Sequence, residues 1–268
     1  MKRILQYLKR QTPGQGVSQE VQMVIHLYRL AADHGDADAQ YNLGDTYSRG
    51  EVVPKDYKEA IKWYRLAANQ NNAKAQASLG ALYFRGRGVP QDYKEALKWY
   101  RLAAENDFAG AYPFLGYMYY YGKGIPQDYQ EAVKWYRLAA HKDDAESQAI
   151  LGQMYDRHFW TMFETGKGVS HDDQEAMKWY RLAADQNNAR AQANLGGMYL
   201  RGQGIPQDYK EAVKWYRLAA DQGDVVAQSV LGMMFETGKG VPHDDQEAMK
   251  WYRLAADQGD SYAKNKVN

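Results

Sequence analysis

Apolar residues recur at helical spacing along the chain, in blocks separated by short polar stretches. In residues 36–50, Ala39, Leu43 and Tyr47 are four residues apart and predict one face of a helix. Residues 57–69 carry two apolar stripes, and a helix with two apolar faces is expected to pack on its own partner and on the next pair. The stripes are Tyr57, Ile61, Tyr64 and Ala68, and Ala60, Trp63 and Ala67.

Polar residues at the ends of these blocks predict where each helix begins and ends. Asp36 is placed to cap the first helix and Gly50 to end it. Asp56 and Glu59 have the spacing of a capping box at the start of the second helix. That helix closes at Asn71, where other copies have glycine, because both residue types tolerate the left-handed conformation.

This pair of antiparallel helices repeats through the chain. The hexapeptide Trp-Tyr-Arg-Leu-Ala-Ala occurs six times, and a weaker copy begins at Leu27. The steps between copies are 36, 36, 36, 44, 36 and 36 residues, and a fixed period of this size indicates stacked repeats. We expect one all-α solenoid over 1–268, with a capping unit at 1–35, repeats at 36–71, 72–107, 108–143, 144–187, 188–223 and 224–259, and a truncated helix at 260–268.

Two kinds of residue hold a fixed place in every copy. A glycine in the first helix predicts close contact between helices, at Gly44, Gly80, Gly116, Gly152, Gly196 and Gly232. The tryptophan of the hexapeptide is expected in the core, at Trp63, Trp99, Trp135, Trp179, Trp215 and Trp251.

Composition excludes several classes of function. The net charge of +1 provides no basic field for nucleic acid. Cysteine is absent, which excludes thiol catalysis and cysteine-based zinc sites. No apolar run approaches the roughly 18 residues of a membrane span. Residues 1–10 lack the apolar core of a signal peptide, so a cytoplasmic location is the default, and a periplasmic or secreted one would need a signal outside this sequence.

The consensus of the copies resembles the Sel-one-like repeat, a relative of the tetratricopeptide repeat. It reads Ala-x-Ala-Gln-x-x-Leu-Gly-x-x-Tyr-x-x-Gly-x-Gly-Val-Pro-x-Asp-Tyr-x-Glu-Ala-x-Lys-Trp-Tyr-Arg-Leu-Ala-Ala and covers nearly all of residues 13–268. The resemblance implies a right-handed α/α superhelix of about seven units without common catalytic residues. Members mostly act as adaptors or scaffolds. Bacterial members are often secreted or periplasmic, and some resemble host-interaction factors or immunity proteins against toxic effectors such as lipases.

Positions that vary between copies are free of the stacking constraint and indicate where a partner binds. On the first helix of each pair they form one face, which by analogy with tetratricopeptide arrays lines a concave groove. Several carry tyrosine, phenylalanine or arginine, the residue types that favour binding hot spots. The candidate partner-binding residues are Tyr41, Arg49, Phe84, Arg85, Tyr117, Tyr120, Tyr121, Arg157, His158, Phe159, Trp160 and Arg201.

Two copies depart from the pattern. In the third, Pro113 falls within the first helix and is expected to kink it unless the helix starts late. Tyr117, Tyr120 and Tyr121 either form a binding surface, which we favour, or repack the core. The fourth copy carries eight extra residues over 156–163, without glycine or proline, and an extended helix or a loop could contain them. Trp160 is either an aromatic finger or folded against a neighbouring helix.

Other signals carry less weight. Lys58, Lys62 and Arg65 form a basic face that we interpret as solvated and paired with acidic residues rather than as a lipid site. His171 and His243 lie in short His-Asp-Asp loops that lack a closed set of metal ligands. We therefore predict a monomeric, non-enzymatic scaffold that binds a protein partner, without cofactor, metal, nucleic acid or transmembrane segment. The alternatives are an immunity protein and a secreted or periplasmic host-interaction factor.

Overall fold

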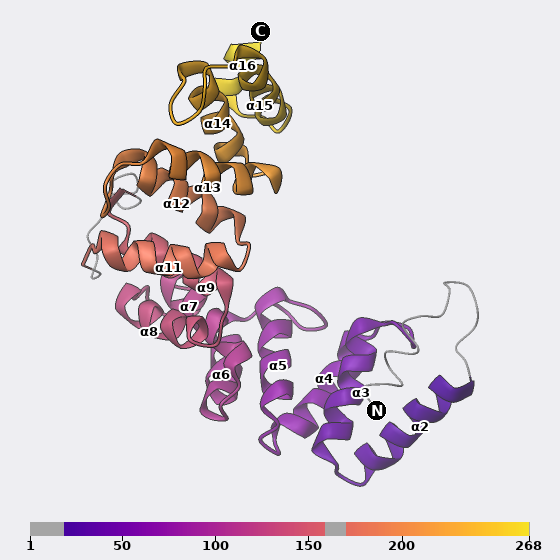
Figure 1. Cartoon of the computed structure of the whole chain (residues 1–268). Coiled ribbons are helices and arrows are strands. Elements are labelled where there is room, and N and C mark those ends of the chain that lie inside the picture. Colours follow the sequence, from indigo (N-terminus) through magenta and orange to yellow (C-terminus); the bar gives the residue numbers. More distant parts are fainter. Residues whose placement is uncertain (1–18, 159–169, 268) are drawn as a thin grey trace. The chain divides into compact units, whose positions relative to one another are not determined.

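A computed structural model of the chain describes residues 19–158 and 170–267. These residues form α-helices joined by short turns, with one 3-10 turn and no strand in the described part (Figure 1). The chain divides into two compact units, Met1–Gln127 and Asp128–Asn268. Each unit is an α/α solenoid in which every helix packs on the next one along the chain.

The first unit contains the helix of the capping unit, the helices of the first two repeats and the first helix of the third. In order they are α2 (Gln19–Asp33), α3 (Ala37–Arg49), α4 (Tyr57–Ala68), α5 (Ala73–Arg85), α6 (Tyr93–Glu105), the 3-10 turn η1 (Ala109–Ala111) and α7 (Tyr112–Tyr121).

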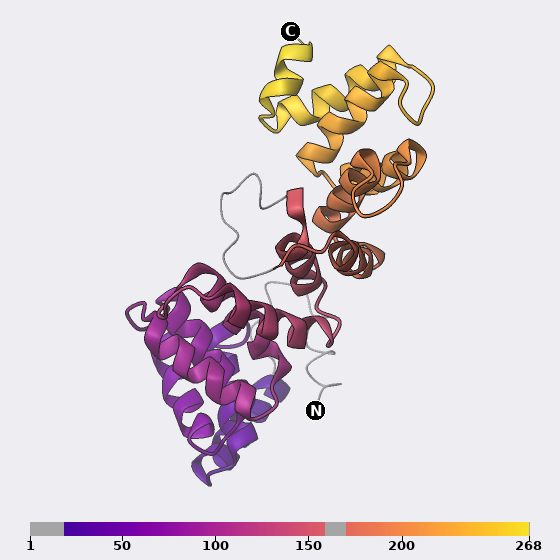
Figure 2. The ribbon, with the colours of Figure 1, turned by 90° about the vertical axis from the view of Figure 1, so that its left-hand side faces the viewer.

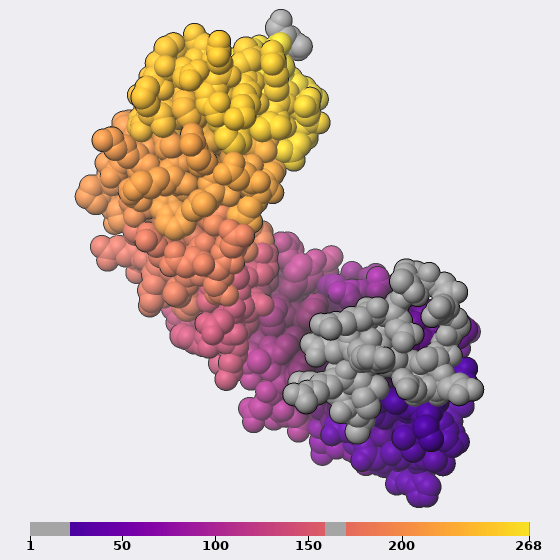
Figure 3. Space-filling view, turned by 45° about the vertical axis from the view of Figure 1, so that its right-hand side comes forward, coloured from indigo at the N-terminus to yellow at the C-terminus, as the bar shows by residue number. Residues whose placement is uncertain are grey.

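The second unit has the same alternation of helices, which follow one another in sequence order in the ribbon (Figure 2). The colours of the space-filling view follow the same order (Figure 3). Its helices are α8 (Tyr129–Ala140), α9 (Ala145–Tyr155), α11 (Asp173–Asp185), α12 (Ala189–Arg201), α13 (Tyr209–Asp221), α14 (Val225–Thr237), α15 (Asp245–Asp257) and α16 (Ser261–Val267).

The helix ends lie close to where the sequence predicts them. The Asp36 side chain accepts the N–H of Ala39, and Gly50 ends α3 in the left-handed conformation. Asn71 has a φ of 62°, as expected for the position where other copies have glycine. For α3 and α4 the local signals therefore place both helix ends.

The capping box at the second helix forms only in part. Asp56 accepts the N–H groups of Lys58 and Glu59, as predicted. Its own N–H does not meet Glu59 but donates to the carbonyl oxygen of Tyr47, 3.0 Å away. The Glu59 carboxylate instead lies 2.6 Å from the Lys62 ammonium. The start of α4 is thereby fastened to the end of α3, and Asp92, Asp172, Asp208 and Asp244 repeat this bond.

The recurring glycines allow the close contact that the sequence predicts. A Cβ atom at Gly44 would lie 2.7 Å from Cδ1 of Tyr64, and one at Gly80 would lie 2.9 Å from Cδ1 of Tyr100. The rings of the Trp-Tyr tyrosines are therefore seated directly on the partner helix. Substituting these glycines would force the rings to move.

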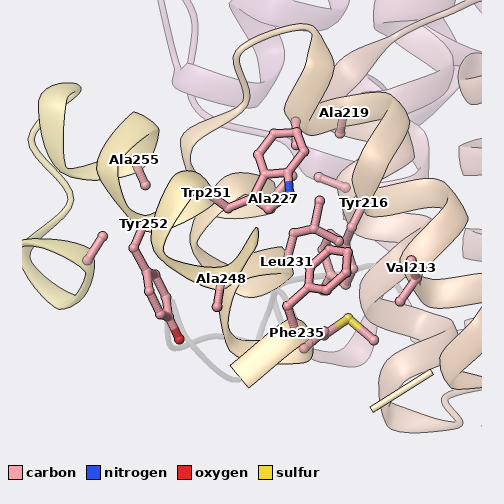
Figure 4. Close-up of a cluster of buried hydrophobic side chains, with 14 of the residues drawn as sticks. Val213, Tyr216, Ala219, Ala227, Leu231, Phe235, Ala248, Trp251, Tyr252 and Ala255 are labelled. Carbon is pink, nitrogen blue, oxygen red and sulfur yellow. The ribbon is translucent and has the colours of Figure 1, made fainter. Parts of the chain in front are cut away.

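The tryptophans enter the core to different degrees. Trp179, Trp215 and Trp251 are buried, as predicted, whereas Trp63, Trp99 and Trp135 are only half-buried. In Figure 4, Trp251 packs in a cluster drawn from α13, α14 and α15 that includes Tyr216 and Leu231.

A ladder of buried glutamines joins successive repeats. Gln148 of α9 donates to the carbonyl of Ala140 at the end of α8, 3.1 Å away. Its side-chain oxygen accepts the amide of Gln186, 2.8 Å away, from the end of α11. The same two bonds recur at Gln40, Gln76, Gln192 and Gln228, with Asn106 in place of the donor glutamine at one rung. The third copy has Tyr112 at this position.

The third copy avoids a kink because its helix starts late. Residues 109–111 form the 3-10 turn, and α7 begins at Tyr112, which places Pro113 in the first turn. Proline is tolerated there because its missing N–H would have no partner within the helix.

In the fourth copy the first helix is interrupted where the extra residues begin. Helix α9 ends at Tyr155, and Asp156 adopts an extended conformation with ψ of 115°. Its side chain accepts the N–H of His158 at 2.8 Å instead of continuing the helix. Residues 157 and 158 are again helical, and the inserted residues 159–163 lie outside the described residues, so the extended helix and the loop both stay predictions. Phe159 and Trp160 lie outside the described residues.

An ion pair fixes α16 to α14 within the second unit. We expect this pair to make the stability of the fold depend on pH. The Glu236 carboxylate accepts bonds from Lys266, 2.6 Å away, and from the Tyr252 hydroxyl, 2.7 Å away. Chiefly through the Lys266 bond, these contacts hold the pKa of Glu236 below its ordinary value of 4.5. A depressed carboxyl pKa stabilises the fold above 4.5, and this contribution is lost as the pH falls through the lowered pKa.

We therefore expect Glu236→Gln to destabilise the fold at pH 7 and to differ less from the parent protein at pH 3. Urea unfolding at both pH values measures the difference. When Lys266→Ala is already present, the destabilisation caused by Glu236→Gln should depend much less on pH. An equal effect of Glu236→Gln at both pH values would contradict the linkage.

Candidate partner-binding site

The buried tyrosines of the second helices extend their rings to the variable face of the first helices. The Tyr64 ring runs under Gly44 and lies 5.9 Å from the Tyr41 ring, centroid to centroid. Its hydroxyl interacts with the side chains of Ser48 and Ser78. Burial is the largest cause of a strongly raised pKa at Tyr64, so the hydroxyl stays neutral and polar at the floor of this face.

An aromatic cluster covers this face at the junction of the second and third copies. We define it as Phe84, Tyr93, Phe114, Tyr117 and Tyr121. Phe84 lies at its centre, with ring centroids 5.3 Å from Tyr93 and 5.6 Å from Tyr117. Tyr117 contacts Tyr121 at 4.4 Å, and Tyr120 contacts Tyr121 at 4.7 Å. The Tyr121 residue is 53% exposed, so a partner can reach its ring.

A cationic pocket lies at the junction of the first and second copies, between α3, α4 and α5. We define it by its four basic residues, Arg49, Lys55, Arg85 and Arg87, around a cavity of about 340 Å³. Ser48, Ser78 and Tyr64 contribute hydroxyl groups, and Asp45 is the one acidic residue of the lining. Phe84 and Arg85 are consecutive, so the aromatic cluster and the cationic pocket adjoin.

The basic residues of the pocket are held by contacts of different strength. Asp45 accepts from Nε of Arg49 at 2.8 Å, and this bond is the first cause of the raised pKa of Arg49. Lys55 and Arg87 both lie over the ring of Tyr57, 5.9 and 5.8 Å from its centroid. Among the described residues, Arg85 has no acidic side chain within ion-pair distance.

The predicted residues of the second unit lie in a separate polar cluster. Arg157 pairs with Asp173 at 3.4 Å, and Arg201 donates to the side chain of Gln203 at 3.1 Å. Gln203 in turn donates to Asp156 at 2.7 Å and to Asp173 at 2.8 Å. Asp156 is only 3% exposed. The two exposed arginines therefore border a polar network around the buried Asp156, and the backbone of His158 joins it through Asp156.

Seven of the predicted residues fall on one face of the first unit. Tyr41, Arg49 and Arg85 lie at or beside the cationic pocket, while Phe84, Tyr117, Tyr120 and Tyr121 belong to or adjoin the aromatic cluster. Lys55 and Arg87 were missed because they lie in loops rather than on helices. Lys55 could have been found by comparison, since the other copies have glutamine or histidine there.

The basic face of the second helices is paired at one lysine of each copy, as predicted, whereas Lys58 has no acidic side chain within ion-pair distance among the described residues. Lys62, Lys98, Lys134, Lys178, Lys214 and Lys250 each meet the glutamate three residues earlier. Arg65 turns toward the next pair and donates to the Tyr83 hydroxyl at 2.6 Å. These contacts leave few free charges on that face.

Within residues 19–158 and 170–267, no helix has the length and apolar character needed to cross a membrane. The same residues contain no cluster of three or more histidine, aspartate or glutamate side chains placed to hold a metal ion.

Comparison with known proteins identifies the repeat. The Sel1 repeat model matches residues 12–36, 37–72, 73–108, 111–144, 145–188, 189–224 and 225–260. No match was found among curated proteins.

Two solved structures share both sequence and fold with the chain. The first is a protective antigen of uropathogenic Escherichia coli with an SLR fold, at 36% identity and a TM-score of 0.84 over 91% of this chain. This chain spans half of that protein's length, 50%. The second is a Sel1 repeat protein from Oxalobacter formigenes, at 31% identity and a TM-score of 0.69, covering 86% of this chain and 96% of that one. With seven matched repeats and two such relatives, the chain belongs to the Sel1 repeat family.

Proposed function

We propose that the protein is a non-enzymatic scaffold that binds a partner protein through the face formed by the aromatic cluster and the cationic pocket. Sel1 repeat proteins generally act as protein-interaction scaffolds, and this supports the class of function. The observation that carries the proposal is the meeting of Phe84 and Arg85 at the end of α5. There the aromatic cluster, in which Tyr121 is exposed, adjoins a cluster of four basic side chains.

The two halves of this face suit the two needs of a protein interface. Tyrosine and phenylalanine bury a large apolar area, and such residues carry most of the energy of many interfaces. Arginine fixes orientation because its planar guanidinium binds carboxylates with two parallel hydrogen bonds. Repacking of the core alone would explain neither the exposed ring of Tyr121 nor the basic side chains next to Phe84.

Site-specific crosslinking tests the proposal. A photoreactive phenylalanine at Tyr121 should trap a discrete protein in the native host, whereas the same group at the exposed Leu66 on the outer face of α4 should not. The trapped protein also separates the alternatives, since a secreted toxic enzyme would indicate an immunity role.

Purified partner then tests the site itself. Tyr121→Ala should weaken binding at least about tenfold if Tyr121 is a hot spot, and Leu66→Ala should leave the affinity unchanged. Circular dichroism establishes that both variants fold. Equal affinities for the two variants would place the interface elsewhere.

A further inference from the structure

The cationic pocket exists because the first junction between repeats is lined by small residues. At the junction of the first two copies, Ser48, Ser78 and Ala81 leave the cavity open above the Tyr64 hydroxyl. At the next junction the corresponding positions are Phe84, Phe114 and Tyr117. These rings fill the space, and Phe114 stacks on Tyr100 with their ring centroids 4.8 Å apart.

At the second junction, the aromatic rings that fill the space change the environment of the buried tyrosine hydroxyl. The Tyr100 hydroxyl is buried and has no hydrogen-bond partner among the described residues. At the first junction Tyr64 lines one cavity together with the hydroxyl side chains of Ser48 and Ser78. The first junction thus keeps a polar floor that apolar packing would not provide.

The charges around this cavity are unbalanced. The lining holds four basic side chains, and Asp45, its one acidic side chain, is already committed to Arg49 at 2.8 Å. Like charges held near one another repel, and a bound anion would relieve that repulsion. The pocket is also within the size range of known ligand pockets, whose volumes begin near roughly 300 Å³.

We propose that the cationic pocket binds the carboxylates of an acidic peptide segment of the partner, with Arg85 as the principal contact. Arg85 is exposed and has no carboxylate of its own, while Arg49 is held in place by Asp45. Lys55 and Arg87 add a second pair of charges across the Tyr57 ring. An aromatic residue next to the acidic run would reach Phe84 and Tyr121. This inference rests on the proposed function and names the chemistry of its partner.

Fluorescence anisotropy with two labelled peptides tests it. The probe is a peptide of six glutamates followed by tryptophan, and its control has glutamine in place of every glutamate. We expect the acidic peptide to bind the full chain and the glutamine peptide to bind at least about tenfold more weakly. Affinity should fall with added salt, because exposed charges are screened within about 10 Å at 0.1 M.

Matched variants locate the binding. Arg85→Gln should reduce the affinity for the acidic peptide at least tenfold, whereas Lys62→Gln, on the outer face and paired with Glu59, should not change it. Equal binding of both peptides, or equal losses in both variants, would overturn the proposal.

A further arm uses inorganic phosphate as a competitor. If phosphate binds at the pocket while the acidic peptide does not, the ligand is a phosphate group and the carboxylate proposal fails. Crosslinking at Tyr121 remains an independent measurement. A partner trapped there without any binding of the acidic peptide would leave the scaffold function standing and refute only this inference.

Discussion

Replacing Tyr180 with alanine is expected to lower the free energy of unfolding of the second unit by about 3–5 kcal/mol. The Tyr180 side chain is fully buried in α11 and seated on Gly152 of α9. Its hydroxyl lies 3.3 Å from the buried carboxylate of Asp156. Alanine would leave a cavity between two helices and remove a polar partner of that carboxylate, and both changes disfavour the folded state.

Urea unfolding followed by circular dichroism measures the loss. Hydrogen exchange locates it, because repeat arrays can open locally, and α9 and α11 should lose protection first. Leu182→Ala is the matched control. This side chain is two residues further along α11 and 43% exposed, so its removal should change stability by less than about 0.5 kcal/mol. Comparable losses in both variants would show that burial of the ring contributes little.

Tyr180→Phe separates the ring from the hydroxyl. The variant keeps the packing on Gly152, while Asp156 retains its bonds from Gln203 and from the N–H of His158. We therefore expect a much smaller loss than for alanine. A loss as large as that of Tyr180→Ala would mean that the hydroxyl, not the ring, stabilises this junction.

Local chemistry explains which parts of the fold could be predicted from the sequence. Asp36, Gly50 and Asn71 act on backbone groups within a few residues of themselves, so their roles are visible in any one copy. The glycine at Gly44 needed comparison between copies, which showed that a small residue recurs there. These features repeat and involve near neighbours, and both properties make them predictable.

The structure departs from the local sequence pattern where distant groups compete with local ones. Glu59 has the spacing to bond the N–H of Asp56, but the carbonyl of Tyr47 occupies that donor. The stretch after Tyr155 has a helical composition, yet Asp156 is engaged by Gln203, 47 positions away, and by Tyr180, 24 positions away. Neither competitor is visible in the local sequence.

The candidate site could be predicted where it lies on helices. Variation between copies indicated Arg49, Arg85 and Tyr121, because helical periodicity places variable positions on one face. It could not indicate that the exposed Arg157 and Arg201 join a polar network through Gln203, since that depends on a side chain from another repeat. Loop residues such as Arg87 have no periodicity to place them.

In the sequence, the glutamine ladder was visible only as a glutamine that recurs at one position of the consensus. A buried glutamine offers an amide NH2 as donor and a carbonyl oxygen as acceptor, and both groups need partners because an unpaired buried amide is destabilising. Gln148 meets this demand with one bond to the preceding helix and one from the following helix. The ladder therefore couples three consecutive helices at each junction, which the apolar contacts alone would not specify.

We expect Gln148→Leu to lower the stability of the second unit by about 1–2 kcal/mol, since it removes two hydrogen bonds worth roughly 1 kcal/mol each. Leucine has nearly the same volume, so the loss reports polar contacts rather than a cavity. The carbonyl of Ala140 keeps its bond from the N–H of Asp143, which limits the penalty. The exposed Gln174→Ala on α11 serves as a control and should be nearly neutral.

A double-mutant cycle with Gln186→Leu determines whether the two glutamines act as a unit. If the bond between them contributes, the second substitution should have little further effect once Gln148 is leucine, because its partner is already gone. Additive losses would mean that the two side chains act independently. In that case the coupling between repeats would rest on the tyrosines and glycines alone, and Tyr112 in the third copy would replace a glutamine without loss of stability.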